Sequence, residues 1–190
     1  DCFTVTASPC TLDPVTFTAP ADLCVNAGVQ AGLGSGSPTG GVYSGTGVID
    51  DGNGMTYSFD PGSAGVGVHA ITYTGSGTGC TATDMVEVFD LPVVSLSTAL
   101  YYCVDAPLQG VPITGGSPSG GVYSGPGVTD NGNGINYSLD PTVGGPGTIT
   151  ITYTITDANG CSNSATSNIE IIECEVEITD PCMCLDNATV

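Results

Sequence analysis

Nine cysteines are the side chains of this 190-residue sequence with the most evident chemistry. They do not form the C-x-x-C pairs that are typical of zinc sites. Their number indicates a disulfide framework instead, and disulfides persist in oxidising compartments. The sequence therefore predicts an extracellular protein.

Two similar stretches of the chain contain two of these cysteines each. Because each stretch has only one such pair, we expect Cys24 to bond with Cys80 and Cys103 to bond with Cys161. In the chain-entropy description, each of these bonds would add about 4 kcal/mol to the free energy of unfolding. Free or metal-bound thiols are the alternative for these four residues.

The remaining cysteines lie toward the two ends of the sequence. Cys2 and Cys10 share a C-x7-C spacing with Cys174 and Cys182, which predicts two local disulfides. Cys184 is then left over, and an odd cysteine in a secreted chain indicates a partner outside the chain. A metal cluster of Cys174, Cys182 and Cys184 is the alternative, although no histidine lies nearby in sequence.

Two glycine-rich segments, DDGNG and DNGNG, are candidates for a calcium site because their side-chain oxygens suit that ion. The candidate ligands are Asp50, Asp51, Asn53, Asp130, Asn131 and Asn133. The same segments are typical of hairpin turns, since Asn-Gly supplies the positive φ angles that tight turns need. The EF-hand pattern with its terminal Glu is absent, and a turn that also holds an ion is compatible with both interpretations.

The other polar groups do not suggest catalysis. His69 aligns with an isoleucine of the second stretch, so we expect it at the edge of the core. The segment GGVYSG, which begins at Gly40 and Gly120, lacks the lysine and the helix of a phosphate loop. We expect it to form a strand with a close backbone approach, with Tyr43 and Tyr123 packing by their rings. No nucleophile, oxyanion donor or cofactor motif accompanies the carboxylates, so we predict no catalytic residue and no enzyme activity.

The elements that position these residues are predicted to be strands. TITITYTIT, from Thr148, alternates isoleucine or tyrosine with threonine, as a half-buried strand does. VEVF at Val86 and IEII at Ile169 repeat the alternation, and clusters of Gly, Pro, Asn and Asp separate the strands. No stretch has a convincing helical pattern. The sequence therefore predicts an all-β fold of the sandwich type.

The chain also repeats itself, since Cys24 and Cys103 are 79 residues apart and Cys80 and Cys161 are 81 apart. A period of this length governs the architecture. The flanks CFTVTASPC and CEVEITDPC match at a distance of 172 residues, which indicates either a longer repeat or two independent disulfide hairpins. The predicted parts are a cysteine-bearing flank at 1–12, one repeat at 13–91, a second repeat at 92–173, and a junction or the start of a next module at 174–190.

The segments ITYTITDANGCSNSATSNIEII and ITYTGSGTGCTATDMVEVF resemble the immunoglobulin-like repeats of large cell-surface proteins of Bacteroidota, including gliding-type adhesins exported by type IX secretion. The resemblance covers both repeats and implies tandem immunoglobulin-like β-sandwiches, each with one disulfide. The chain has no Trp, so the packed Trp of antibody-type domains is missing. It also lacks the sorting domain of type IX cargo, and we therefore expect a fragment or a processed chain.

The charge of the chain restricts its partners. It has 19 acidic residues and no Lys or Arg, for a formal charge of −19. Nucleic acids and anionic membranes are excluded as partners because they are bound through Lys and Arg, whereas divalent cations or cationic surfaces suit the charge. No apolar run reaches the roughly 18 residues of a membrane span.

These observations predict a non-catalytic structural segment of an extracellular cell-surface filament or adhesin stalk. Its partners would be adjacent repeats or copies of itself, with an external surface or glycan as a further possibility. We predict no cofactor, and calcium is the one candidate considered. The segment could belong to one very long polypeptide or be a subunit that polymerises. A carbohydrate-binding or ligand-binding module at the tip of such a stalk is the alternative function.

Overall fold

The computed structural model of the chain describes residues 14–77, 79–106 and 112–174. The chain divides into two compact units. Unit 1 comprises Asp1–Val93 together with Thr156–Asn163, and unit 2 comprises Val94–Ile155 together with Ser164–Val190. A short turn segment of the second sequence repeat is therefore part of unit 1.

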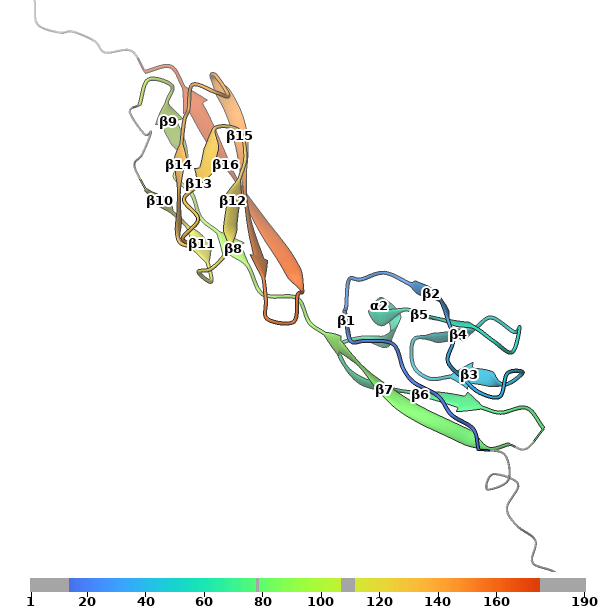
Figure 1. Ribbon diagram of the computed structural model, residues 1–190. Helices are drawn as coiled ribbons and strands as arrows, with labels where there is room; N and C mark the ends of the chain where they lie inside the picture. The colour runs from blue at the N-terminus through green and yellow to red at the C-terminus, as the bar shows by residue number, and fades with distance from the viewer. Residues whose placement is uncertain (1–13, 78, 107–111, 175–190) are drawn as a thin grey trace, which may run out of the picture. The chain divides into compact units, whose positions relative to one another are not determined.

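Unit 1 contains two sheets and one short helical turn in its described part (Figure 1). Its elements are β1 (Leu23–Cys24), β2 (Gln30–Leu33), β3 (Val42–Ser44), β4 (Val48–Asp50), β5 (Tyr57–Phe59), α2 (Pro61–Ala64), β6 (Gly67–Thr74) and β7 (Thr81–Phe89). One sheet has the order β1-β7-β6-β3 and the other has the order β2-β5-β4. The strand pairs are antiparallel except for β1 and β7, which are parallel.

The core of unit 1 follows the alternation of its strands. In β6, Ile71 and Tyr73 are fully buried, and His69 lies on the same face at its edge. Burying a side chain of this size stabilises the fold by about 1.5–3 kcal/mol. The buried cluster consists of Tyr43, Tyr57, Phe59, Ile71, Tyr73, Val86 and Val88.

The short helix α2 was not expected from the sequence. Asp60 is its N-cap and accepts hydrogen bonds from the amides of Gly62 and Ser63, while Pro61 occupies the first turn. Both are start signals for a helix, but four residues are too few to show a helical period. The carbonyl at its end, that of Gly65, accepts a hydrogen bond from His69 Nε2 at 2.7 Å. His69 thus has a structural contact at the edge of the core.

Unit 2 repeats the arrangement of strands. Its elements are β8 (Ser95–Leu96), β9 (Tyr101–Cys103), β10 (Ile113–Thr114), β11 (Gly116–Ser117), β12 (Val122–Ser124), β13 (Val128–Asp130), β14 (Asn136–Leu139), β15 (Gly147–Thr156) and β16 (Ser162–Ile172). The sheets have the orders β12-β15-β16-β9, β10-β14-β13 and β11-β8, and β9 runs parallel to β16. The strand predicted at Thr148–Thr156 is β15, and its isoleucines and Tyr153 face the core.

The prediction of an all-β fold with tandem immunoglobulin-like sandwiches is confirmed. Equivalent tyrosines form a cluster in each core, with ring centroids 4.4–4.7 Å apart in the pairs of Tyr43 with Tyr57 and with Tyr73. Within the described ranges, no helix is long and apolar enough to cross a membrane.

Candidate functional site

The disulfides are the most distinctive covalent feature of the described residues. Cys24, at the end of β1, is bonded to Cys161, which lies in the turn before β16. Cys103, at the end of β9, is bonded to Cys174, two residues beyond β16. Cys80 is disulfide-bonded as well and is buried.

The predicted pairs Cys24–Cys80 and Cys103–Cys161 are therefore wrong, and the strand register gives the reason. Cys24 lies beside Phe89, the last residue of β7, whereas Cys80 immediately precedes the first residue of β7. Nine residues of strand separate the two ends, which is about 30 Å at the usual rise. A disulfide requires Cα atoms within about 7 Å of each other. The two cysteines of the first repeat thus lie at opposite ends of one strand.

The second repeat has the same geometry. Cys103 lies beside Ile172 at the end of β16, and Cys161 immediately precedes the start of that strand. The eleven intervening residues span about 36 Å. The predicted bond between Cys174 and Cys182 is also wrong, because Cys174 is bonded to Cys103. The predictions for Cys2, Cys10, Cys182 and Cys184 fall outside the described residues.

The candidate calcium ligands close turns in the structure. The amides of Tyr43 and Gly52 donate to the two carboxylate oxygens of Asp50, at 2.9 and 3.0 Å. Asn53 Oδ1 accepts from the amides of Met55 and Thr56, both at 2.8 Å. The hydroxyl of Thr56 donates to Asp51 Oδ2 at 2.5 Å. These oxygens therefore satisfy the backbone of the turn.

The second repeat uses Asp130 and Asn133 in the same way. Asp130 accepts from the amides of Tyr123 and Gly132, at 3.0 and 2.9 Å, and Asn133 Oδ1 accepts from two amides just after it. Asn131 Oδ1 accepts from the hydroxyl of Ser138 at 3.2 Å. No group of three or more His, Cys, Asp or Glu side chains that could hold a metal occurs among the described residues. Calcium binding by the Asp and Asn oxygens remains a prediction.

The glycine-rich motif encloses a buried tyrosine, an arrangement that sequence reasoning missed. The ring of Tyr73 lies against Gly36 and Gly41, where an added Cβ would overlap atoms of the ring. The hydroxyl of Tyr73 accepts from the amide of Gly41 at 2.9 Å and donates to the carbonyl of Pro38 at 2.5 Å. We call this arrangement the tyrosine clamp.

The tyrosine clamp recurs in unit 2. Gly116 and Gly121 flank Tyr153, and an added Cβ at either glycine would approach the ring to 2.5 Å. The Tyr153 hydroxyl accepts from the amide of Gly121 at 2.9 Å and donates to the carbonyl of Pro118 at 2.6 Å. The expected close backbone approach at GGVYSG is thus an approach to a tyrosine ring. The glycine-rich motif recurs because a side chain at these glycines would collide with the buried tyrosine ring of each unit.

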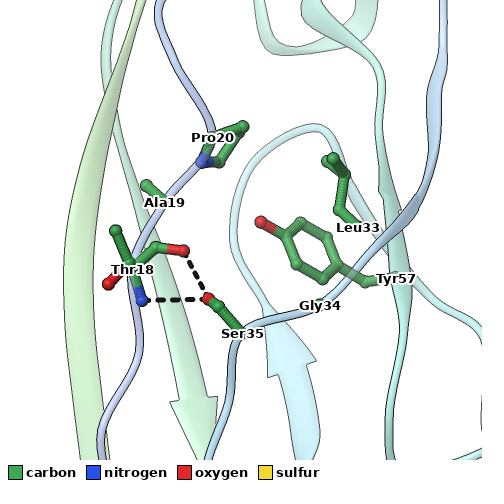
Figure 2. Close-up of a pocket in the computed structure, with 7 residues that line it drawn as sticks. All are labelled: Thr18, Ala19, Pro20, Leu33, Gly34, Ser35 and Tyr57. Atoms are coloured by element: carbon green, nitrogen blue, oxygen red, sulfur yellow. Dashed lines mark hydrogen bonds between the residues drawn. The ribbon is translucent and has the colours of Figure 1, made fainter.

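A pocket of about 260 Å³ lies in unit 1 (Figure 2). Its lining residues are Thr18, Ala19, Pro20, Leu33, Gly34, Ser35 and Tyr57. The Ser35 hydroxyl accepts from the amide of Thr18 at 3.0 Å and donates to its carbonyl at 2.5 Å, so its hydrogen bonds are made within the wall. Burial raises the pKa of Tyr57 to about 12, with a smaller contribution from Tyr43. The lining contains no carboxylate, histidine or cysteine, and its one phenol is neutral at physiological pH.

Comparison with known proteins finds a family match for the second repeat. Residues 103–170 match the bacterial Ig domain family. No curated protein sequence matches the chain. The match covers most of the second repeat, including its tyrosine clamp residues from Gly116 to Tyr153.

The chain is also similar to solved structures at low sequence identity. A SusE-like surface-located polysaccharide binding protein from the Bacteroides thetaiotaomicron heparin utilisation locus is 14% identical, with a TM-score of 0.40, over 83% of this chain and 34% of that one. Extracellular domains 3–5 of Drosophila OTK are 14% identical, with a TM-score of 0.33, over 83% of this chain and 61% of that one. This chain thus spans about a third of the first protein and less than two thirds of the second.

Proposed function

We propose that the chain is a non-catalytic structural segment of a cell-surface filament or adhesin stalk. The fold of each unit is that of an immunoglobulin-like domain, and such domains occur in extracellular and surface proteins. The finer assignment, to large Bacteroidota adhesins exported by type IX secretion, rests on the resemblance of the two repeats. The proposed parts remain the two repeats at 13–91 and 92–173 with their cysteine-bearing flanks.

One observation supports this function above the others, namely the bond between Cys24 and Cys161. It joins the first repeat of the sequence to a turn of the second repeat. A bond of this kind adds a second covalent connection, beside the backbone, between consecutive repeats, which is useful where a molecule must transmit force.

The alternative function is a carbohydrate-binding module. Sugar rings are commonly held by stacking on exposed aromatic side chains, and the aromatic residue of the pocket, Tyr57, is fully buried. Tyr101 is an exposed aromatic side chain but does not line the pocket. The described residues therefore favour the structural function.

The experiment is an immunoblot of the source cells with an antibody against residues 14–174, before and after brief protease treatment of intact cells. For a stalk we expect a species much heavier than 18.8 kDa that disappears on treatment of intact cells. A ladder that collapses to about 18.8 kDa with reductant would indicate a disulfide-linked polymer of subunits. A protease-resistant species with free thiols would contradict the proposal.

A glycan array with the purified oxidised chain tests the alternative in parallel. Binding to a defined glycan that is lost on Leu33→Asp, a change in the wall of the pocket, would favour the binding module. Thr81→Asp, an exposed position at the start of β7, serves as the matched control for added charge. For a structural segment we expect no binding by any of the three proteins.

A further inference from the structure

The two described disulfides interleave along the sequence. The order of the cysteines is Cys24, Cys103, Cys161 and Cys174, and the bonds join the first to the third and the second to the fourth. The bonds therefore do not close two separate loops. Each bond has one of its two cysteines inside the loop that the other closes. Backbone and disulfides together therefore offer several covalent routes between Cys24 and Cys174.

The shortest route leaves out most of the chain. Along the backbone, Cys24 and Cys174 are 150 residues apart. The bond from Cys24 to Cys161 removes a separation of 137 residues, which leaves the 13 residues from Cys161 to Cys174. The route through Cys103 is longer, because 79 residues separate Cys24 from Cys103. Tension applied to the two ends would consequently pass from Cys24 to Cys161 and then along the chain to Cys174.

The short route is a strand that is already extended in the fold. Residues Ser162–Ile172 form β16, which lies between β15 and β9 in its sheet (Figure 1). A strand rises about 3.3 Å per residue, and a fully stretched chain reaches at most about 3.6 Å. The 13 residues can therefore lengthen by only a few ångströms, even if every other strand of both units were lost.

We propose that the interleaved disulfides form a covalent tether that fixes the distance between Cys24 and Cys174 under load. In the oxidised chain, unfolding of the sandwiches releases only these few ångströms between the two residues. Without the bonds, the 137 residues would add about 450–490 Å of contour length. The tether thus also keeps the two ends connected if the backbone is cut between residues 25 and 160. This proposal deepens the stalk function and depends on it for its biological meaning, whereas the tether itself depends only on the two bonds.

The experiment is single-molecule stretching of the full chain between handles at its ends. A background in which Cys2, Cys10, Cys80, Cys182 and Cys184 are serine keeps only the four cysteines of the two interleaved bonds and prevents other routes. Reduction should add about 450–490 Å of extension to this protein. The oxidised wild-type chain is stretched beside it as the reference for a fully native protein.

Two single variants of the background give unequal results if the bonds interleave. Cys161→Ser leaves only the route through Cys103 and should lengthen the oxidised chain by about 66 residues, or about 220–240 Å. Cys103→Ser removes the other bond but leaves the short route intact, so its extension should equal that of the background protein. Equal lengthening by both variants, or none on reduction, would overturn the proposal.

A gel assay tests the same bonds without force. A protease site is inserted between Asp90 and Leu91, at the exposed end of β7, and the oxidised protein is cut. The fragments should stay together without reductant in the four-cysteine background and in Cys103→Ser, and should separate in Cys161→Ser. Separation in all three would refute the tether. A tether that holds in a protein absent from the cell surface would refute only the stalk function.

Discussion

Two buried tyrosines of unit 2 should respond differently to substitution by phenylalanine, because only one of them uses its hydroxyl group in hydrogen bonds. Tyr153 and Tyr137 are both fully buried in one core cluster. The hydroxyl of Tyr153 accepts from the amide of Gly121 and donates to the carbonyl of Pro118. The hydroxyl of Tyr137 is buried and has no hydrogen-bond partner among the described residues. Burial accordingly raises the pKa of the Tyr137 phenol well above its ordinary value.

The magnitudes follow from what each substitution leaves behind. Tyr153→Phe leaves the buried amide of Gly121 without a partner, whereas the carbonyl of Pro118, an exposed residue, can be hydrated again. An unsatisfied buried donor costs about 1–3 kcal/mol, so we expect a total loss of about 2–3 kcal/mol. Tyr137→Phe removes a hydroxyl group that loses its hydrogen bonds to water on folding and gains none within the described residues. We expect that change to be neutral or to stabilise the protein by about 1 kcal/mol.

The assay is urea unfolding of the oxidised full chain, followed by far-UV circular dichroism. For a denaturant dependence of about 1–3 kcal/mol per molar, Tyr153→Phe should lower the midpoint by about 1 M or more. Tyr137→Phe should leave the midpoint unchanged or raise it. Tyr73→Phe in unit 1 has the contacts of Tyr153 and should behave like Tyr153→Phe. Equal losses for Tyr137→Phe and Tyr153→Phe would refute the reasoning, because ring packing alone would then explain both.

Three further outcomes are expected. Gly36→Ala should destabilise the chain by about 1–3 kcal/mol through overpacking against Tyr73. Gly62→Ala should be nearly neutral, because the nearest atom to its added Cβ would be Asp60 Oδ1 at 3.3 Å. Equal urea midpoints for the two variants would contradict this prediction. Burial raises the pKa of Tyr57 to about 12, whereas the pKa of a tyrosine in the unfolded chain is near 10. The contribution of the neutral phenol to stability is therefore complete below pH 10 and is lost as the pH rises from 10 toward 12. The urea midpoint should fall over this pH range, and it should fall less in Tyr57→Phe. Asn133→Ala should cost about 1 kcal/mol equally with calcium or EDTA, measured by thermal unfolding, and a wild-type midpoint that rises with calcium would instead establish the ion site.

The fold class was predictable because alternation is a local signal. The residues of β15 carry the period of a half-buried strand in their own order, and the repeat placed a second such strand about 80 residues earlier. The close approach at GGVYSG was also predictable from glycine alone. Its target was not, because Tyr73 is 32 residues beyond Gly41 and only the pairing of β3 with β6 brings them together.

The disulfide pairs were not predictable for a similar reason. The expectation that each repeat closes its own bond assumed that its two cysteines lie at the same end of the sheet. Their positions depend on β1 and β9, which are two and three residues long and too short to show any alternation. The parallel pairing of each with the last strand of its repeat places the first cysteine at the far end of that strand.

The absence of Lys and Arg changes what the acidic residues do in this fold. With no Lys or Arg in the sequence, acidic side chains such as Asp84 accept hydrogen bonds from backbone amides. Asp84 accepts from the amide of Ala19, 65 residues away, and this bond and that from the amide of Met85 hold its pKa below the ordinary value. Such bonds fix the extended segment around Ala19 against β7 without any ion pair. Backbone amides cannot move to follow a carboxylate, so these bonds depend on the length of the acidic side chain. Replacing Asp84 by Glu would move its carboxylate oxygens away from the amides of Ala19 and Met85. The high negative charge is therefore compatible with a well-defined fold, and the surface is left free of cations that could bind neighbouring acidic chains.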